Sequence, residues 1–233
     1  NFKTELLGLK STHPKFQASF DLSKCLAPSK VNIKSSSVIR RRLISRSGRY
    51  PVFSPNERYL LFQRWTGSKE VIEMYDHKTK LNKRLSNNNK NVEERHAVFL
   101  PDTENEWQIL YGHKENEIEQ LFTKDSTNDK AKPILKLIDL SGSIPAVGKN
   151  QTIYFAGSKI DSEGRFLGSP DLFQYNLKTK ITKNLTKTKW EEWRPAPDPS
   201  GRFIYYIANP TGQFDIYRLD VDTGVKTLFY GSE

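Results

Sequence analysis

The sequence predicts an all-β fold built from repeated four-stranded sheets. A pattern of apolar strand, tight turn and aromatic-rich strand occurs four times between Arg49 and Tyr206. Aromatic residues make up 12% of the 233-residue chain, including 10 Tyr and 13 Phe, and such residues favour strands. Segments with helical periodicity are nearly absent. Repeats of about 45 residues that hold four short antiparallel strands are typical of β-propeller blades.

The best-preserved repeat is the segment Arg49–Asp76. It reads as an apolar strand at Tyr50–Phe53, a Ser-Pro-Asn-Glu turn, a strand at Arg58–Trp65, a turn at Gly67 and a strand at Val71–Tyr75. Proline presets φ in such turns, while Asn, Asp and Gly accept left-handed geometry. We therefore expect tight turns between antiparallel neighbours.

Three further repeats align with the first when one proline or alanine is placed in the same column. The aligned residues are Pro51, Ala97, Pro145 and Pro195. The strands expected after the turn are Tyr59–Phe62, Gln108–Tyr111, Thr152–Phe155 and Phe203–Tyr206. The third strands are expected to end at Asp76, Thr123, Asn176 and Asp220, and the closing strands are expected at Leu81–Leu85, Ile134–Ile138, Ile181–Leu185 and Val225–Phe229. One such sheet cannot bury both faces alone, so the sheets are expected to stack around a ring.

The expected blades span about 48–93, 94–141, 142–190 and 191–233, following a repeat of blade length. The N-terminal segment 1–47 is predicted to form a partial blade or ring-closing strands, which gives about five blades in total. Within it, Val38–Ile44 alternates apolar and basic residues at period two, and Phe16–Leu22 is a second strand candidate. The start at Asn1 fits a processed product and equally fits a fragment of a longer protein.

Charge and cysteine content restrict the classes of protein. Lys and Arg exceed Asp and Glu by 37 to 27, which gives +10, but the lysines are scattered and phosphate binding needs a concentrated basic surface. Nucleic acid is therefore an unfavoured partner. The single cysteine, Cys25, excludes an intrachain disulfide. Apolar runs are too short for a membrane-spanning helix.

Two segments, PVFSPNERYLLF (51–62) and RPAPDPSGRFIYY (194–206), resemble the core of the TolB-like propeller repeat, a relative of the WD40 type. The blade ends Arg84-Leu85-Ser86 and Asn184-Leu185-Thr186 resemble the closing strand of that repeat. The second and third copies depart from it, with an insertion up to Trp107 and with Gly148-Lys149-Asn150 in place of Ser-Pro-Asp.

The resemblance implies a function in protein interaction. TolB-like propellers commonly serve as docking surfaces in the periplasm or cell envelope, and related propellers stand in front of serine peptidase domains. The chain lacks the G-x-S-x-G motif of such domains. We therefore predict a non-enzymatic scaffold that docks a peptide or protein at the channel mouth or blade loops, within an envelope or multi-protein assembly. A cytoplasmic location remains an alternative. Other functional alternatives are a propeller glycoside hydrolase or lyase and nucleic-acid binding through a basic face.

Candidate binding residues occupy the two columns before the aligned proline or alanine. They are Arg49, Tyr50, Arg95, His96, Trp193 and Arg194, and blade 3 contributes Ser143 and Ile144 at the same positions. Arginine forks and aromatic faces dominate protein-binding hot spots, and arginine donates two parallel hydrogen bonds to a carboxylate. We therefore predict a partner-binding rim at the channel entrance. The competing interpretation is that these residues pack between blades or pair with neighbouring acids.

Catalytic and metal sites are not predicted. The four histidines show no metal-ligand spacing, one cysteine cannot build a thiolate site, and no motif indicates a cofactor. Glycosidases need a pair of carboxyl groups on inner strands. The nearest acids are Glu94, Glu191 and Glu192, which we interpret as solvated loop residues.

Overall fold

The structure is a computed structural model that describes residues 43–101, 106–128, 130–134 and 139–231. The strand candidate Phe16–Leu22, the residue Cys25 and most of Val38–Ile44 lie outside these residues. The described strands belong to one compact unit that begins at Ile44.

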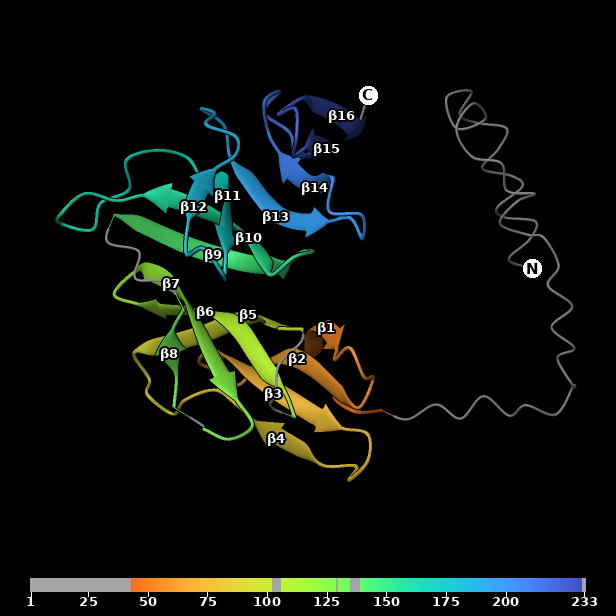
Figure 1. Cartoon of the computed structure of the whole chain (residues 1–233). Coiled ribbons are helices and arrows are strands. Elements are labelled where there is room, and N and C mark those ends of the chain that lie inside the picture. Colours follow the sequence, from red (N-terminus) through yellow and green to blue (C-terminus); the bar gives the residue numbers. More distant parts are fainter. Residues whose placement is uncertain (1–42, 102–105, 129, 135–138, 232–233) are drawn as a thin grey trace, which may run out of the picture. The chain divides into compact units, whose positions relative to one another are not determined.

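The described residues contain no helix and form four antiparallel sheets of four strands each, here called blades 1 to 4 (Figure 1). Blade 1 consists of β1 (Gly48–Phe53), β2 (Tyr59–Trp65), β3 (Glu70–Asp76) and β4 (Asn82–Arg84). Blade 2 consists of β5 (Val92–Phe99), β6 (Gln108–Glu115), β7 (Ile118–Asp125) and β8 (Lys132–Pro133). Blade 3 consists of β9 (Leu140–Val147), β10 (Thr152–Lys159), β11 (Asp171–Asn176) and β12 (Thr182–Asn184). Blade 4 consists of β13 (Glu192–Pro197), β14 (Phe203–Ala208), β15 (Asp215–Asp220) and β16 (Lys226–Tyr230).

The blades follow one another in chain order, with β1, β5, β9 and β13 as the inner strands (Figure 1). The predictions of an all-β fold and of a propeller arrangement are confirmed. The predicted fifth blade falls mainly on residues outside those described. In blade 2 the described outer strand is β8 at Lys132–Pro133, and the Ile134 amide donates to the Leu121 carbonyl at 2.9 Å; the other residues of the predicted closing strand Ile134–Ile138 lie outside those described.

Short polar side chains close the turns between strands. The Ser54 hydroxyl accepts the Tyr59 amide at 2.9 Å, and Asp198 accepts the Phe203 amide at 2.9 Å in the equivalent turn of blade 4. Between β3 and β4, Asp76 accepts the Lys78 amide at 2.7 Å. These side-chain acceptors compensate backbone donors that no neighbouring strand pairs, which explains the turn composition.

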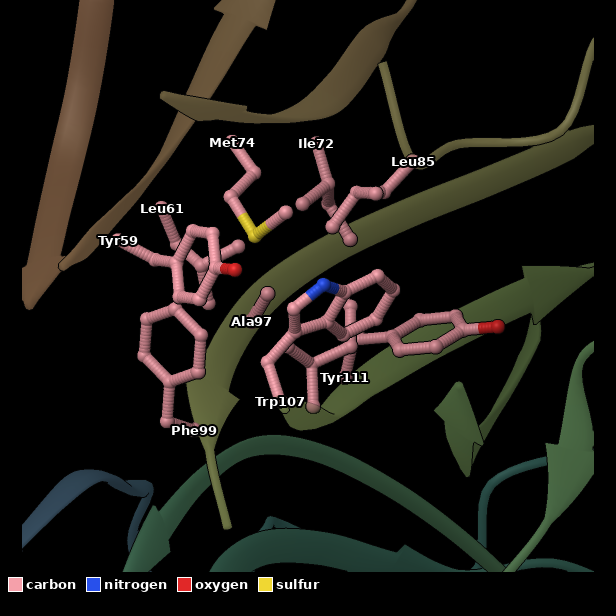
Figure 2. Close-up of a cluster of buried hydrophobic side chains, with 10 residues drawn as sticks. Tyr59, Leu61, Ile72, Met74, Leu85, Ala97, Phe99, Trp107 and Tyr111 are labelled. Atoms are coloured by element: carbon pink, nitrogen blue, oxygen red, sulfur yellow. The ribbon is translucent and has the colours of Figure 1, made fainter. Parts of the chain in front are cut away.

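Apolar side chains fill each junction between consecutive blades. Figure 2 shows the cluster between blades 1 and 2, in which Leu61, Ile72 and Met74 of blade 1 meet Trp107 and Tyr111 of blade 2. Two similar clusters join blade 2 to blade 3 and blade 3 to blade 4. Stability therefore resides in contacts between neighbouring sheets, as repeat architecture requires.

The two ends of the blade series are related differently. No described strand of blade 1 packs against a strand of blade 4. Their inner strands are linked by side chains alone, because Arg194 Nη2 lies 3.4 Å from the Tyr50 hydroxyl. The inner strands consequently surround a central space, and the site lies there.

Candidate functional site

A cavity of about 760 Å³ lies among the inner strands and the loops that join second to third strands. All six residues predicted from the sequence contribute to its lining: Arg49, Tyr50, Arg95, His96, Trp193 and Arg194. The structure thus brings together residues from three blades that are far apart in the chain. That they bind a partner stays a prediction.

A β-bulge in every inner strand helps to place these side chains. The residue just before the aligned proline or alanine has a left-handed backbone in all four blades, with φ of 51° at Tyr50, 55° at His96, 52° at Ile144 and 55° at Arg194. The register shifts at the same point in each blade. Left-handed geometry costs a non-glycine residue roughly 1–2 kcal/mol. Strain repeated at a cavity marks a candidate functional position.

Most cations of the cavity are paired with acids. Arg95 Nη2 lies 2.8 Å from Glu119 of the same blade, and Lys114 Nζ lies 2.7 Å from Glu117. Arg49 Nη1 is 3.8 Å from Glu70, while its side chain is 64% exposed. Arg95 therefore follows the competing interpretation and pairs with a neighbouring acid, whereas Arg49 remains open to a ligand.

Arg194 differs from the other cations of the cavity. Its guanidinium carbon lies 5.2 Å from the centre of the Tyr50 ring, its Nη2 lies 3.4 Å from the Tyr50 hydroxyl, and no ion pair with a carboxylate of the described residues is found for it. A guanidinium over an aromatic face keeps most of its N–H donors free. Arg194 is thus a donor group with unused capacity on the cavity wall.

His96 adds a neutral polar group. Burial and the charges of Arg95 and Arg194 lower the pKa of His96 to about 4, so its imidazole is uncharged at neutral pH. Its backbone N–H donates to Gln63 Oε1 at 3.0 Å, and its ring lies edge-on to Tyr50 with 5.9 Å between centres. The buried Nδ1 has no hydrogen-bond partner among the described residues. A ligand can supply that partner.

Sequence reasoning missed the floor and the outer rim of the cavity. Blade 3 provides further small residues to the lining beside the aligned Ser143, namely Ser141, Ala156, Gly157 and Ser158. Trp65, Phe166 and Phe214 line the mouth from three blades, and each is about half exposed. In the sequence, Trp65, Phe166 and Phe214 share one signal of their location. Each lies at or after the end of a second strand, before the chain turns back into the third strand.

The interpretation of Glu94 and Glu192 as solvated acids is wrong, because both are buried at equivalent positions of β5 and β13. Although burial opposes ionisation, His113, Lys124 and the Asn87 amide hold the pKa of Glu94 below its usual value. Burial raises the pKa of Glu192 to about 7. The Thr186 and Thr188 hydroxyls lower this pKa only in part, since neither Glu192 oxygen meets a partner at full hydrogen-bond geometry among the described residues.

No group of three or more His, Cys, Asp or Glu in the described part of the chain is arranged to hold a metal ion. No helix able to span a membrane occurs in residues 43–101, 106–128, 130–134 and 139–231.

Comparison with known proteins shows the fold. No protein-family model and no curated protein sequence matches the chain. Among solved structures, TolB from Acinetobacter baumannii is similar at 18% identity and a TM-score of 0.62, over 80% of this chain and 44% of TolB. A puromycin-hydrolysing peptidase of Mycobacterium tuberculosis is similar at 12% identity and a TM-score of 0.61, over 81% of this chain and 30% of the peptidase. The fold is that of TolB and related β-propellers, and the chain spans less than half of either protein.

The prediction that the protein is not an enzyme is contradicted. Besides the peptidase, an oligogalacturonate lyase in complex with manganese is similar at 12% identity and a TM-score of 0.50, over 75% of this chain and 48% of the lyase. Propellers of this kind therefore occur in proteins named as enzymes. The absence of a G-x-S-x-G motif does not decide whether this protein has an enzymatic activity. At sequence identities of 12–18%, these comparisons support a shared fold and assign no activity to this chain.

Proposed function

We propose that this propeller binds a peptide or protein partner in the central cavity and that Arg194 receives a carboxylate of that partner. The observation that carries the proposal is the open guanidinium of Arg194, in a cavity where Arg95 and Lys114 are each held by an acid. Arg49 is the second arginine that a ligand can reach. Charge-assisted bonds from arginine to carboxylate are strong and directional.

The rest of the cavity suits an extended chain. Half-exposed Trp65, Phe166 and Phe214 offer aromatic surface at the mouth, and the serines of blade 3 leave room and hydroxyl groups beneath. Aromatic anchors surrounded by polar contacts are the usual composition of a protein-binding hot spot. We place this partner in the cell envelope or in a multi-protein assembly, as the resemblance of the repeats to TolB-like propellers implies.

The proposal is tested with a library of random dodecapeptides panned on the immobilised protein. Enriched peptides are expected to share an acidic side chain or a free terminal carboxylate next to apolar residues. Fluorescence anisotropy then compares the wild type with Arg49→Ala/Arg194→Ala, for which we expect binding at least about tenfold weaker, equal to about 1.4 kcal/mol.

The matched control is Arg84→Ala/Arg202→Ala, which removes the same charge from arginines that do not line the cavity. Equal weakening in both double variants indicates a general charge effect and contradicts a specific site. Unchanged affinity in Arg49→Ala/Arg194→Ala, or enrichment of peptides without acidic groups, overturns the proposal.

A further inference from the structure

The junction between blades 3 and 4 holds a buried carboxyl group that does not line the cavity. Glu192 in β13 is 0% exposed, and neither of its oxygens meets a partner at full hydrogen-bond geometry among the described residues. A buried charge without partners is strongly unfavourable, so burial favours the protonated form of this group. The pKa of Glu192 is accordingly raised by burial to about 7.

Titratable groups face Glu192 from three neighbouring strands. Asp171 of β11 opposes its ionisation, while Lys226 of β16 favours it. Tyr206 of β14 has its own pKa raised, chiefly by burial and then by the charge of Glu192. The Lys226 ammonium donates to the Thr186 carbonyl at 3.0 Å, so one of its N–H groups is taken by the backbone. Glu192 therefore gains only partial compensation when it ionises.

The junction between blades 1 and 2 shows how an equivalent glutamate is stabilised as an anion. Glu94 of β5 accepts the backbone amide of Asn87 at 2.7 Å. Asn87 follows Ser86, and Ser86 is equivalent to Thr186, because the hydroxyl of each accepts an amide of the third strand. Lys187 thus takes the place of Asn87 in the junction between blades 3 and 4.

The Lys187 amide is withheld from Glu192 by a side chain that blade 1 lacks. It donates to Asn184 Oδ1 at 3.1 Å, whereas the equivalent residue of blade 1 is Arg84, which has no such acceptor. Lys187 also has a left-handed backbone, with φ of 49°, a conformation that is uncommon for a residue with a long side chain. The threonines on either side of Lys187 both act on Glu192 through their hydroxyl groups. A strained amide therefore lies beside a carboxyl group that lacks a donor.

The segment that carries Lys187 also reaches the cavity. It continues to Glu191, whose amide donates to Asn209 Oδ1 at 2.8 Å and whose carboxylate accepts the Trp193 indole N–H at 3.2 Å. Trp193 lines the cavity from blade 4. A movement of Lys187 is therefore passed along a short stretch of backbone to an aromatic side chain of the cavity wall.

We propose that the junction of blades 3 and 4 is a pH-sensitive switch. When Glu192 releases its proton to water, the Lys187 amide leaves Asn184 and donates to the new carboxylate. The arrangement then matches that of Glu94 in blade 2. The same movement carries Glu191 with it and shifts Trp193 at the cavity wall. The switch operates without a ligand and is independent of the function proposed above.

Amide NMR spectra of the isotopically labelled full chain between about pH 5 and about pH 8.5 test the inference, since ionisation of Glu192 falls in this interval. The Lys187 amide and the Trp193 indole are expected to move together, with one midpoint no higher than about pH 7, because the new hydrogen bond favours the ionised form. Lys187→Arg and Trp193→Phe assign the two signals. Glu192→Gln is expected to hold both signals at their low-pH positions throughout.

Asn184→Ala removes the competing acceptor of the Lys187 amide. It is expected to lower the midpoint by at least about one pH unit, a tenfold change in proton affinity. Thr182→Ala is the control, because it changes an exposed residue of the same strand, β12, and is expected to leave the midpoint unchanged.

Several results overturn the inference. A transition that persists in Glu192→Gln, or a wild-type Lys187 amide that does not move in this interval, shows that Glu192 does not control the loop. A Lys187 signal that moves while the Trp193 indole stays fixed contradicts the link to the cavity. An unchanged midpoint in Asn184→Ala, with a circular dichroism spectrum like that of Thr182→Ala, contradicts the competition for the amide. Glu192→Gln decides alone if Asn184→Ala does not fold.

Discussion

Glu94 and Glu192 show how one position acquires opposite properties from its neighbours. Both occupy the equivalent place on an inner strand and both are buried. Glu94 accepts the Asn87 amide at 2.7 Å and lies 3.7 Å from Lys124 Nζ, so it is kept ionised. Around Glu192 burial outweighs the Thr186 and Thr188 hydroxyls and the Lys226 ammonium, which favour the ionised form, and nearby Asp171 opposes ionisation. Desolvation then decides the protonation of Glu192.

The stability of the protein is expected to fall between about pH 4.5 and pH 7 because of Glu192, whose pKa rises from 4.5 to about 7 on folding. Folding stabilises the protonated form, so the contribution is complete below the unfolded pKa and lost as the pH passes the folded one. The difference corresponds to about 3 kcal/mol. Glu192→Gln should remove this slope and raise the free energy of unfolding at pH 8, measured by urea denaturation at pH 5 and pH 8.

Glu94→Gln is the matched variant, for which the expected pH dependence of the free energy of unfolding has the opposite sign. The folded pKa of Glu94 is lowered, so its contribution is present at neutral pH and lost as the pH falls below the usual range. Neutralising it leaves the buried Lys124 ammonium without its counter-charge, which we expect to cost about 3 kcal/mol at pH 7. If both glutamine variants change the free energy of unfolding in the same direction, the opposite pKa shifts of Glu94 and Glu192 are contradicted.

Gly112 governs the pairing of Arg95. A Cβ atom at this position would collide with the Glu119 carboxylate, which crosses over β6 to reach Arg95. Gly112→Ala is therefore expected to displace Glu119, to free the Arg95 guanidinium and to lower the free energy of unfolding by about 1–3 kcal/mol. Gly168→Ala, where a Cβ meets no atom within 4 Å, serves as control in the same denaturation experiment. Equal stability of the two variants would contradict this role.

At the scale of the element, the inner strand with its left-handed bulge is the unit that recurs in every blade. Ile144 is the least suited residue for this geometry, since β-branched side chains are outliers at positive φ. Ile144→Gly is expected to increase the free energy of unfolding by about 0.5–1 kcal/mol, because the relief of about 1–2 kcal/mol of steric strain exceeds the extra backbone entropy that glycine loses on folding. Val147→Gly on the same strand, where φ is ordinary, should decrease it; chemical denaturation of both variants measures the difference.

The bulge also explains which parts of the site were predictable. The strands themselves follow from alternating apolar and aromatic residues, and the second and third strands of all four blades lie close to their expected positions. Counting at period two fails across a bulge, because the extra residue reverses which face the preceding side chains occupy. Glu94 and Glu192, interpreted from the sequence as solvated loop residues, lie buried in β5 and β13 just before this bulge, where the sequence pattern does not give their direction. The mouth residues Phe166 and Phe214 lie in loops, where no period indicates direction.

At the scale of the whole molecule, consecutive blades are strongly coupled while the two ends of the series are not. Phe155 lies in the cluster between blades 2 and 3 and stacks on Phe173 with 5.5 Å between ring centres. We expect Phe155→Ala to cost about 3–5 kcal/mol, as large-to-small changes in a packed core do. Tyr50→Phe removes only the hydroxyl that Arg194 reaches and is expected to cost less than about 0.5 kcal/mol. Thermal or urea unfolding of both variants measures this contrast, and comparable losses would mean that the ends are joined more firmly than their contacts indicate.

The four bulges give the propeller a property useful to protein engineers. Tyr50, His96, Ile144 and Arg194 reach one space from four blades, and their unusual backbone is supplied by the scaffold whatever side chain is present. These four positions can therefore be substituted independently, because they share nearly the same backbone conformation and all line the cavity. Substituting histidine at Tyr50, Ile144 and Arg194, beside His96, would test whether the existing backbone can hold an artificial metal site.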